Sequence, residues 1–331
     1  VLEVPATVTQ DGTTWTVKGI DNDALINNAE LAAVIWNAEV AFTATVSNPN
    51  LLLYVKSEEY APSTIKNVIV NGVASNIILM DASSGNSFYC PKEFTAQKIS
   101  YTHYYSMITG IGESKGWESI ALPFDVQTVT HSSKGTIVPF ANWKRGDAEK
   151  PFWLYELTGN GFMTSSSIKA YTPYIISMPN NPQYDSKWLL NGSVTFAASS
   201  VTIGVSDDVQ TPTYKDRTFT PCFSDRAGNE GLYALNVKND YSSENGGSPE
   251  GSRFVLNLRK IHPFEAYMTT MSGSRLFIDI FDDMATDIEM IMIEDGVFEK
   301  EGAVYDLKGH KINKPSKKGV YIINGKKQII K

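Results

Sequence analysis

The sequence predicts a mostly β protein whose largest part is an antiparallel β-sandwich or jelly roll. Short stretches rich in apolar, β-branched and aromatic residues alternate with polar residues at every second position, and turn pairs such as Asn191-Gly192 separate them. Little of the chain shows the three-to-four-residue apolar spacing of an amphipathic helix. Many short strands with few helices are typical of sandwiches and jelly rolls.

Length and charge narrow the class further. A chain of 331 residues is longer than one hydrophobic core usually organises. We therefore expect three parts: a leucine-rich-repeat-like region with linking strands (1–94), the β-sandwich (95–290) and a small C-terminal β-hairpin domain (291–331). Hydrophobic residues at 42% and charged residues at 20% indicate a folded, soluble protein. The net charge of −7 argues against a nucleic-acid binder, which needs a basic surface.

The first part begins with a hairpin signal. The turn pair Asp11-Gly12 separates two stretches with strand-like composition, Leu2–Val8 and Thr14–Ile20. Asp-Gly favours the tight turn that joins neighbouring antiparallel strands. A short helix is expected to follow over Ala24–Ala33.

Two apolar clusters come next, one at Leu31, Val34 and Ile35 and one over 51–55, each with asparagines close by. Their spacing of about twenty residues is typical of leucine-rich repeats, in which a strand and a turn stack on a neighbouring unit. Two such units bury too little surface to stand alone. We expect them to pack on the next part of the chain.

The sandwich is predicted from a series of strands. In the segment 120–126 the residues alternate strictly, which places Leu122, Phe124 and Val126 on one buried face. Pro123 lacks an amide donor, so this strand is expected at a sheet edge or a bend. The predicted strands are Thr95–Ser106, Trp117–Val126, Phe152–Leu157, Tyr171–Met178, Val194–Phe196, Val201–Val205, Leu232–Val237, Arg253–Arg259, Phe264–Thr270 and Leu276–Phe281, with a further turn at Asn245-Gly-Gly247.

The C-terminal segment is basic and predicts hairpins. Asn324-Gly325 separates the strand-like stretches 320–323 and 328–330, and Lys308-Gly309 marks a second turn. Residues 301–331 contain eight lysines against two carboxylates. Lysines along an edge hairpin keep it soluble, which we favour over contact with an anionic surface.

Three sets of phrases resemble exported proteins of the Bacteroidetes. Val-Pro-Ala-Thr-Val-Thr (4–9) followed by Trp-Thr-Val-Lys-Gly-Ile-Asp-Asn-Asp-Ala-Leu (15–25) resembles the segment that precedes the repeats in leucine-rich-repeat surface proteins of the Bacteroides surface protein A type. Gly-Trp-Glu-Ser-Ile-Ala-Leu-Pro-Phe (116–124) and Pro-Phe-Glu-Ala-Tyr-Met (263–268) are similar to phrases of a β module in such proteins. The segment 302–331 resembles a C-terminal sorting-type domain.

These resemblances imply an exported protein at the cell surface or outside the cell that works in adhesion. The printed sequence starts at Val1 without a charged leader, so we expect that a signal peptide has been removed. No apolar run is long enough to predict a transmembrane segment. Cys90 and Cys222 either pair in an oxidising compartment or are buried thiols, and both alternatives stay open at this point.

Residue patterns for catalysis are weak, and we expect a non-enzymatic protein without metal or cofactor. Gly112-Glu-Ser-Lys-Gly116 fits the G-x-S-x-G pattern of a nucleophile elbow, but a strand rather than a helix is expected after it. The four histidines are scattered, with no carboxylate at a metal-ligand spacing. Asp207-Asp208 and Asp282-Asp283 match solvated turns better than a glycosidase acid pair, because adjacent strand residues face opposite ways.

The candidate binding residues are Arg145, Gly146 and Asp147, with Trp143 and Trp188. An Arg-Gly-Asp turn can present its arginine to an acidic groove and its carboxylate to a receptor-held divalent cation, as integrin ligands do. The two tryptophans have polar neighbours and can act as flat platforms for sugar rings, whereas Trp117 and Trp153 are expected in the core. The expected partner is a host or bacterial surface protein; the alternative is a glycan.

Overall fold

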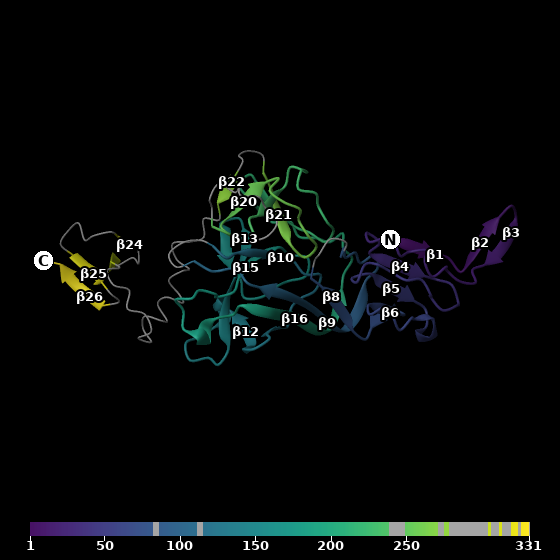
Figure 1. Cartoon of the computed structure of the whole chain (residues 1–331), viewed down its shortest axis with the longest axis horizontal. Coiled ribbons are helices and arrows are strands. Elements are labelled where there is room, and N and C mark those ends of the chain that lie inside the picture. The colour runs from purple at the N-terminus through teal and green to yellow at the C-terminus, as the bar shows by residue number, and fades with distance from the viewer. Residues whose placement is uncertain are drawn as a thin grey trace.

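Strands make up most of the regular structure in the computed structural model of this chain, which confirms the mostly β class. The structure describes residues 1–81, 86–110, 115–237 and 249–270, together with the backbone of short strands at 275–277, 304–305, 311–312, 319–323 and 326–330. Within these residues the helical elements are three short 3-10 turns, η1 (Glu58–Tyr60), η2 (Phe140–Asn142) and η3 (Ser186–Trp188). Figure 1 shows the arrangement of the strands.

The N-terminal hairpin is confirmed at the turn Asp11-Gly12, but Leu2–Val4 of its predicted first strand belongs to another sheet. Its strands β2 (Thr7–Gln10) and β3 (Thr13–Thr16) pair in antiparallel register and project from one end of the molecule (Figure 1). Asp11 and Gly12 both have positive φ, 48° and 78°, as the mirror-image turn of a two-residue hairpin requires.

The predicted helix over Ala24–Ala33 is wrong, because consecutive turns occupy residues 22–27 and strand β4 (Ala33–Trp36) follows. The segment is rich in aspartate and asparagine, whose side chains bond to nearby backbone and compete with a helix. The Asp23 amide donates to the Asp21 carboxylate at 2.9 Å, which is such a local bond.

Parallel strands form the N-terminal stack, at the right of Figure 1. Ala33 of β4 lies opposite Leu52 of β5, and Leu53 of β5 lies opposite Val68 of β6. The stack consists of β1 (Leu2–Val4), β4, β5 (Leu52–Val55) and β6 (Val68–Val70) in that order. Parallel stacking at this spacing is what the repeated apolar clusters predicted, and both faces of β4 and β5 are buried.

Buried asparagines hold the turns of this stack. The Asn50 side chain donates to the Met80 carbonyl at 3.1 Å and accepts the Met80 amide at 2.7 Å. Asn67 does the same between the Pro49 carbonyl and the Ile78 amide. Each asparagine side chain therefore bonds one backbone N–H and one backbone C=O that have no partner in the parallel sheet. This explains why asparagines accompany the apolar clusters.

The stack continues directly into the body through a shared sheet. Both β7 (Val73–Ala74) and β8 (Ile77–Met80) pair in parallel with the long strand β9 (Phe94–Tyr105). Strands of the predicted first part therefore pair with a strand of the second, so one sheet spans the boundary predicted at residue 94. The whole sheet has the order β1-β4-β5-β6-β7-β9-β16-β11-β12-β13-β15-β10, with β8 on β9 and β14 on β13.

The body is built around β9 and β16 (Gly192–Ile203), paired antiparallel from Tyr105 opposite Gly192 to Phe94 opposite Ile203. The prediction of two separate strands over 194–205 is wrong, because they form one strand with an irregularity at Ser200, whose φ is 53°. The other strands of this part are β10 (Glu118–Ile120), β11 (Thr128–His131), β12 (Gly135–Pro139), β13 (Lys150–Thr158), β14 (Gly161–Thr164) and β15 (Tyr174–Ser177). The body is not purely antiparallel, since β12 and β13 run parallel.

Strand β10 is shorter than predicted and stops at Ile120. Among the strands that the structure describes, it pairs with β15 alone, so the expected edge position is confirmed. Strict alternation does not hold beyond it, because Ala121, Leu122 and Phe124 are all fully buried. The Ala121 amide leaves the sheet and donates to the Phe264 carbonyl at 2.8 Å, which carries the chain toward a second sheet.

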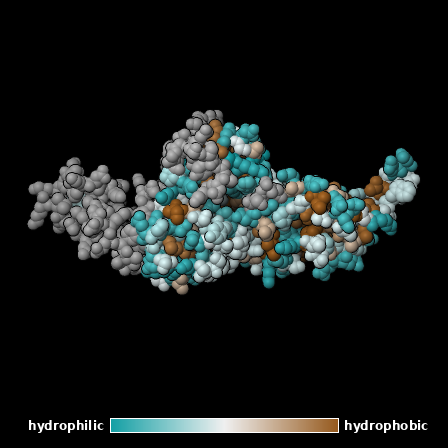
Figure 2. All heavy atoms as spheres, in the orientation of Figure 1, coloured by the Kyte–Doolittle hydropathy of each residue, from teal (hydrophilic) through white to brown (hydrophobic). Residues whose placement is uncertain are grey.

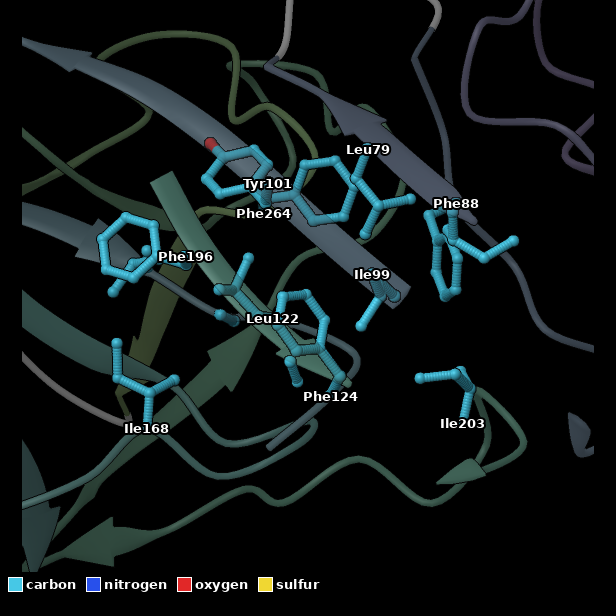
Figure 3. Packing of buried hydrophobic residues seen from close by; sticks show 14 of the residues in the cluster. Leu79, Phe88, Ile99, Tyr101, Leu122, Phe124, Ile168, Phe196, Ile203 and Phe264 are labelled. Atoms are coloured by element: carbon cyan, nitrogen blue, oxygen red, sulfur yellow. The ribbon is translucent and has the colours of Figure 1, made fainter. Parts of the chain in front are cut away.

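The large sheet folds over on itself and encloses the main core. Side chains from β9 and β16, such as Ile99 and Phe196, pack against Leu122 and Phe124 from the segment after β10 (Figure 3). Phe264, from a loop between two strands of a second sheet, completes this core with its ring 4.9 Å from that of Tyr101. The β10 end of the folded sheet therefore faces the central strands β9 and β16 across an apolar interior.

The second sheet lies above the first in Figure 1 and packs on β13 and β15 through an aromatic cluster. Its strands, in sheet order, are β17 (Thr213–Tyr214), β18 (Arg217–Pro221), β21 (Ala266–Thr270), β19 (Tyr233–Leu235), β20 (Arg253–Leu256) and β22 (Arg275–Phe277). Gly251 joins the two sheets, since its carbonyl accepts the Trp117 amide at 3.1 Å. The predicted turn at 245–247 lies outside the described residues.

The C-terminal strands are β23 (Val304–Tyr305), β24 (Lys311–Ile312), β25 (Gly319–Ile323) and β26 (Lys326–Ile330). Ile323 lies opposite Lys326 in an antiparallel pair, so a hairpin with a two-residue connection forms where the sequence predicted it. The turn residues Asn324-Gly325 and Lys308-Gly309 lie outside the described residues.

Both cysteines are buried free thiols, so the second of the two alternatives matches the structure. Burial raises the pKa of Cys90 to about 11 and that of Cys222 to about 12. We expect both thiols to react with a thiol-specific disulfide reagent only after unfolding, because the reactive thiolate is scarce and enclosed. Rapid labelling of the native chain at neutral pH would contradict this placement.

Candidate functional site

The Arg-Gly-Asp sequence forms a defined turn in the loop between η2 and β13. The Asp147 amide donates to the Lys144 carbonyl at 3.0 Å, and the Asp147 carboxylate accepts the Lys144 amide at 2.8 Å. Gly146, at φ 99°, has a backbone conformation that few other residues adopt. The turn is therefore closed by its own backbone and by the carboxylate, which limits its flexibility.

The charged groups of this turn face solvent. Lys144, Arg145, Gly146 and Asp147 are all exposed. One carboxylate oxygen of Asp147 takes the Lys144 amide, and a carboxylate has lone pairs left for a cation or a second donor. The turn thus presents two cationic side chains and one anionic side chain at one place on the surface.

Trp143 anchors the loop to the protein. Its side chain is half-buried, and its indole Nε1 donates to the Glu149 carbonyl at 3.1 Å, which closes the loop across its base. Its ring meets that of Trp188 edge to face at 5.8 Å. The structure therefore brings together the two tryptophans that the sequence analysis selected, directly beside the Arg-Gly-Asp turn.

Trp188 does not present an open face, so that part of the platform prediction is wrong. Its side chain is only 6% exposed, although its sequence neighbours are polar. The η3 turn, capped by Asp185, directs the indole inward, and the ammonium groups of Lys150 and Lys187 lie over the ring at 5.3 and 5.5 Å. Trp188 therefore supports Trp143 and the loop from below.

A continuous set of aromatic rings supports this site. Phe140 packs against Trp143 at 6.2 Å and against Trp153 at 5.4 Å, and Trp117 packs against Trp153 at 6.4 Å. Trp117 and Trp153 are buried, as the sequence analysis expected. Trp15, which is 62% exposed on the projecting hairpin, is not among the predicted binding residues.

A second polar cluster was also missed. His103 on β9 is bonded on both ring nitrogens, Nδ1 to the Asp81 carboxylate and Nε2 to the Glu118 carboxylate, each at 2.7 Å. Tyr101 donates to the other oxygen of Asp81 at 2.8 Å. The sequence spacing of the histidines gave no sign of these two carboxylate partners. The partners come from β10 and from the residue after β8, and only the folding of the sheet brings them to β9.

The charge of this cluster follows from its geometry. Burial alone would lower the pKa of His103, but the Glu118 and Asp81 carboxylates outweigh it and raise the pKa to about 10. The pKa values of Tyr101 and Tyr105 are raised well above their usual range by burial and by the same carboxylates. At neutral pH the cluster is thus an imidazolium between two carboxylates, with neutral tyrosines beside it.

This arrangement links strand β9 to β10 and to the end of β8. A protonated imidazole cannot act as a general base or a metal ligand. The imidazole ring separates Asp81 from Glu118, so the two carboxylates do not face each other across an open cleft as glycosidase carboxylates do. Asp207 accepts a bond from the Tyr89 hydroxyl at 3.3 Å. Ser114 and Asp282-Asp283 lie outside the described residues.

In the part of the chain that the structure describes, no group of three or more histidine, cysteine or acidic side chains is arranged to hold a metal ion. The same residues include no helix with the length and apolar character needed to cross a membrane. Comparison of the chain with protein-family models, curated proteins and solved structures finds no match.

Proposed function

We propose that this chain is a non-enzymatic protein, exported to the cell surface, that binds a host or bacterial surface protein through the turn 144–147. The observation that supports the proposal most is that Arg145 and Asp147 are exposed on a closed turn held on a rigid aromatic base. Preorganisation lowers the conformational entropy lost on binding, so a small contact area can give useful affinity.

The chemistry of the turn suits a receptor that combines an acidic groove with a bound divalent cation. Arg145 carries a planar guanidinium that can pair bidentately with a carboxylate. Asp147 supplies an oxygen ligand, the type that calcium and magnesium prefer. Figure 2 shows the apolar side chains on the face in view as separate small patches among hydrophilic ones.

Cell adhesion to surfaces coated with the full chain tests this proposal. Asp147→Asn keeps an oxygen that can accept the Lys144 amide but removes the charge, and we expect at least a tenfold loss of adhesion, worth about 1.4 kcal/mol. Asp147→Glu keeps the charge but moves the carboxylate, and a similar loss is expected. Asp208→Glu, an exposed aspartate in another loop, is the matched control and should adhere normally. Equal adhesion of all variants would refute the role of the turn.

Glycan binding is the second candidate, and the half-buried Trp143 beside exposed lysines supports it. An indole face can stack on a sugar ring while neighbouring side chains bond its hydroxyls. Loss of glycan-array signal in Trp143→Ala, with adhesion unaffected by Asp147→Asn, would favour this function over protein adhesion.

A further inference from the structure

The outer face of the body sheet carries an aligned set of hydroxyl side chains. Thr102 of β9 lies opposite Thr195 of β16, Thr195 lies opposite Thr130 of β11, and Thr130 lies opposite Thr136 of β12. Directly opposite residues point to the same side of a sheet, so the four threonines form one row across four strands. Met80 of β8, opposite Thr102, extends the row to a fifth strand.

Neighbouring rows have the same character. Ser100 lies opposite Ala197, which lies opposite Thr128, and Tyr104 lies opposite Ser193. We call this surface the hydroxyl face; it consists of Ile78, Met80, Ser100, Thr102, Tyr104, Thr128, Thr130, Thr136, Ser193, Thr195 and Ala197.

The hydroxyl face is open to solvent and its eleven residues are uncharged; the next row on the same side holds the exposed Lys98, opposite Ser199. Thr102, Thr130 and Thr136 are exposed, and Tyr104 is 61% exposed. The alternate residues of β9, such as Tyr101 and Tyr105, point the other way into the core. Solvent-facing surfaces ordinarily carry many charged side chains. An uncharged row that crosses five strands, from Met80 to Thr136, is therefore unusual for a chain of net charge −7.

The side chains of this face are also held in place. Thr102 and Thr195 bond to each other through their hydroxyls at 2.8 Å. Threonine is branched at Cβ and has little χ1 freedom, and the backbone of each threonine is held in a paired strand. Little side-chain entropy is lost when such a surface binds a ligand.

We propose that the hydroxyl face binds a neutral polysaccharide. Each threonine or serine hydroxyl both donates and accepts hydrogen bonds, as do the hydroxyls of a sugar. The exposed Tyr104 ring supplies a flat apolar surface for the carbon-bound hydrogens of a sugar ring. Because the hydroxyl face carries no charged side chain, it suits a neutral polysaccharide and offers no electrostatic attraction to an acidic polysaccharide.

Two other occupants fit less well. With strands about 4.8 Å apart and rows about 6.8 Å apart, the face covers roughly 300–400 Å². A stable protein partner or a second copy of this chain needs about 800 Å² on each side. Serine and alanine are also depleted in protein interfaces, whereas they contribute several positions here.

Retention of the full chain in native gels containing soluble neutral β-glucan, xyloglucan or dextran tests the proposal, with polygalacturonate as the acidic probe. We expect binding to at least one neutral probe, unchanged by salt, and at least tenfold weaker binding for Thr195→Lys at the centre of the face. Tyr104→Ala changes an exposed side chain and should weaken binding without unfolding the protein. Thr7→Lys on the distant hairpin is the matched control.

Four results would overturn the proposal: no retention by any neutral probe, equal retention of both face variants and the wild type, preference for polygalacturonate, or self-association that Thr195→Lys abolishes. Asp147→Asn should retain polysaccharide binding in full, so the outcome is independent of the turn 144–147.

Discussion

Replacing Gly251 with alanine is expected to lower the free energy of unfolding by about 4 kcal/mol, among the largest effects of any single methyl group in this chain. A Cβ at this position would lie 2.3 Å from the Trp117 nitrogen and 2.5 Å from the Trp117 oxygen, and neither backbone atom can move alone. The backbone φ of Gly251 is +64°, a conformation that residues with a Cβ atom rarely adopt. Chemical denaturation followed by tryptophan fluorescence measures the loss.

Gly231→Ala is the matched control for this prediction. Its φ is +77°, but a Cβ there would meet no atom within 4 Å. Only backbone strain remains, so we expect a loss of about 1 kcal/mol. If both variants lose the same free energy, the close contact between Gly251 and Trp117 is not what joins the two sheets.

The second large effect concerns His103, whose replacement by glutamine should destabilise the protein by about 3 kcal/mol at neutral pH. Removing the imidazolium leaves Asp81 and Glu118 close together without a cation between them. The bonds also link the end of β8 and strand β10 to β9, so the loss should be accompanied by faster hydrogen exchange in β10.

The pH dependence of this contribution has a definite sign. The pKa of His103 is raised to about 10 in the folded chain, whereas the pKa of a histidine in the unfolded chain is about 6.5. The stabilisation is therefore complete below pH 6.5 and is lost as the pH rises toward 10. Because other groups also titrate there, the quantity to measure is the stability difference between wild type and His103→Gln. A difference that stays constant from pH 6.5 to 10 would contradict the charged cluster.

Local patterns in the sequence predicted local structure well. Asp11-Gly12 joins two paired strands, and the strands on either side of positions 324–325 also pair, because a hairpin register depends on the residues between its strands. The apolar cluster over 51–55 became a buried parallel strand, since its composition leaves no polar face. The helix expected before Ala33 failed because aspartate and asparagine side chains compete locally for the backbone.

Long-range features were harder to predict. The partners of His103 lie 22 and 15 residues away in sequence, and no motif marks a pair that forms only when a sheet folds over. The row through Thr102 and Thr195 likewise depends on strand register, which a single strand does not reveal. Trp188 was misjudged because exposure was inferred from polar neighbours, while the η3 turn directs the ring inward.

The most direct test of the proposed adhesion is surface plasmon resonance of the full chain over an immobilised Arg-Gly-Asp-reading receptor ectodomain, in buffer containing a divalent cation. Saturable binding is expected, removed by chelation of the cation, by a short Arg-Gly-Asp peptide and by Asp147→Asn. Absence of binding, or binding that Asp147→Asn leaves unchanged, would contradict the assignment of the turn 144–147 as the contact surface.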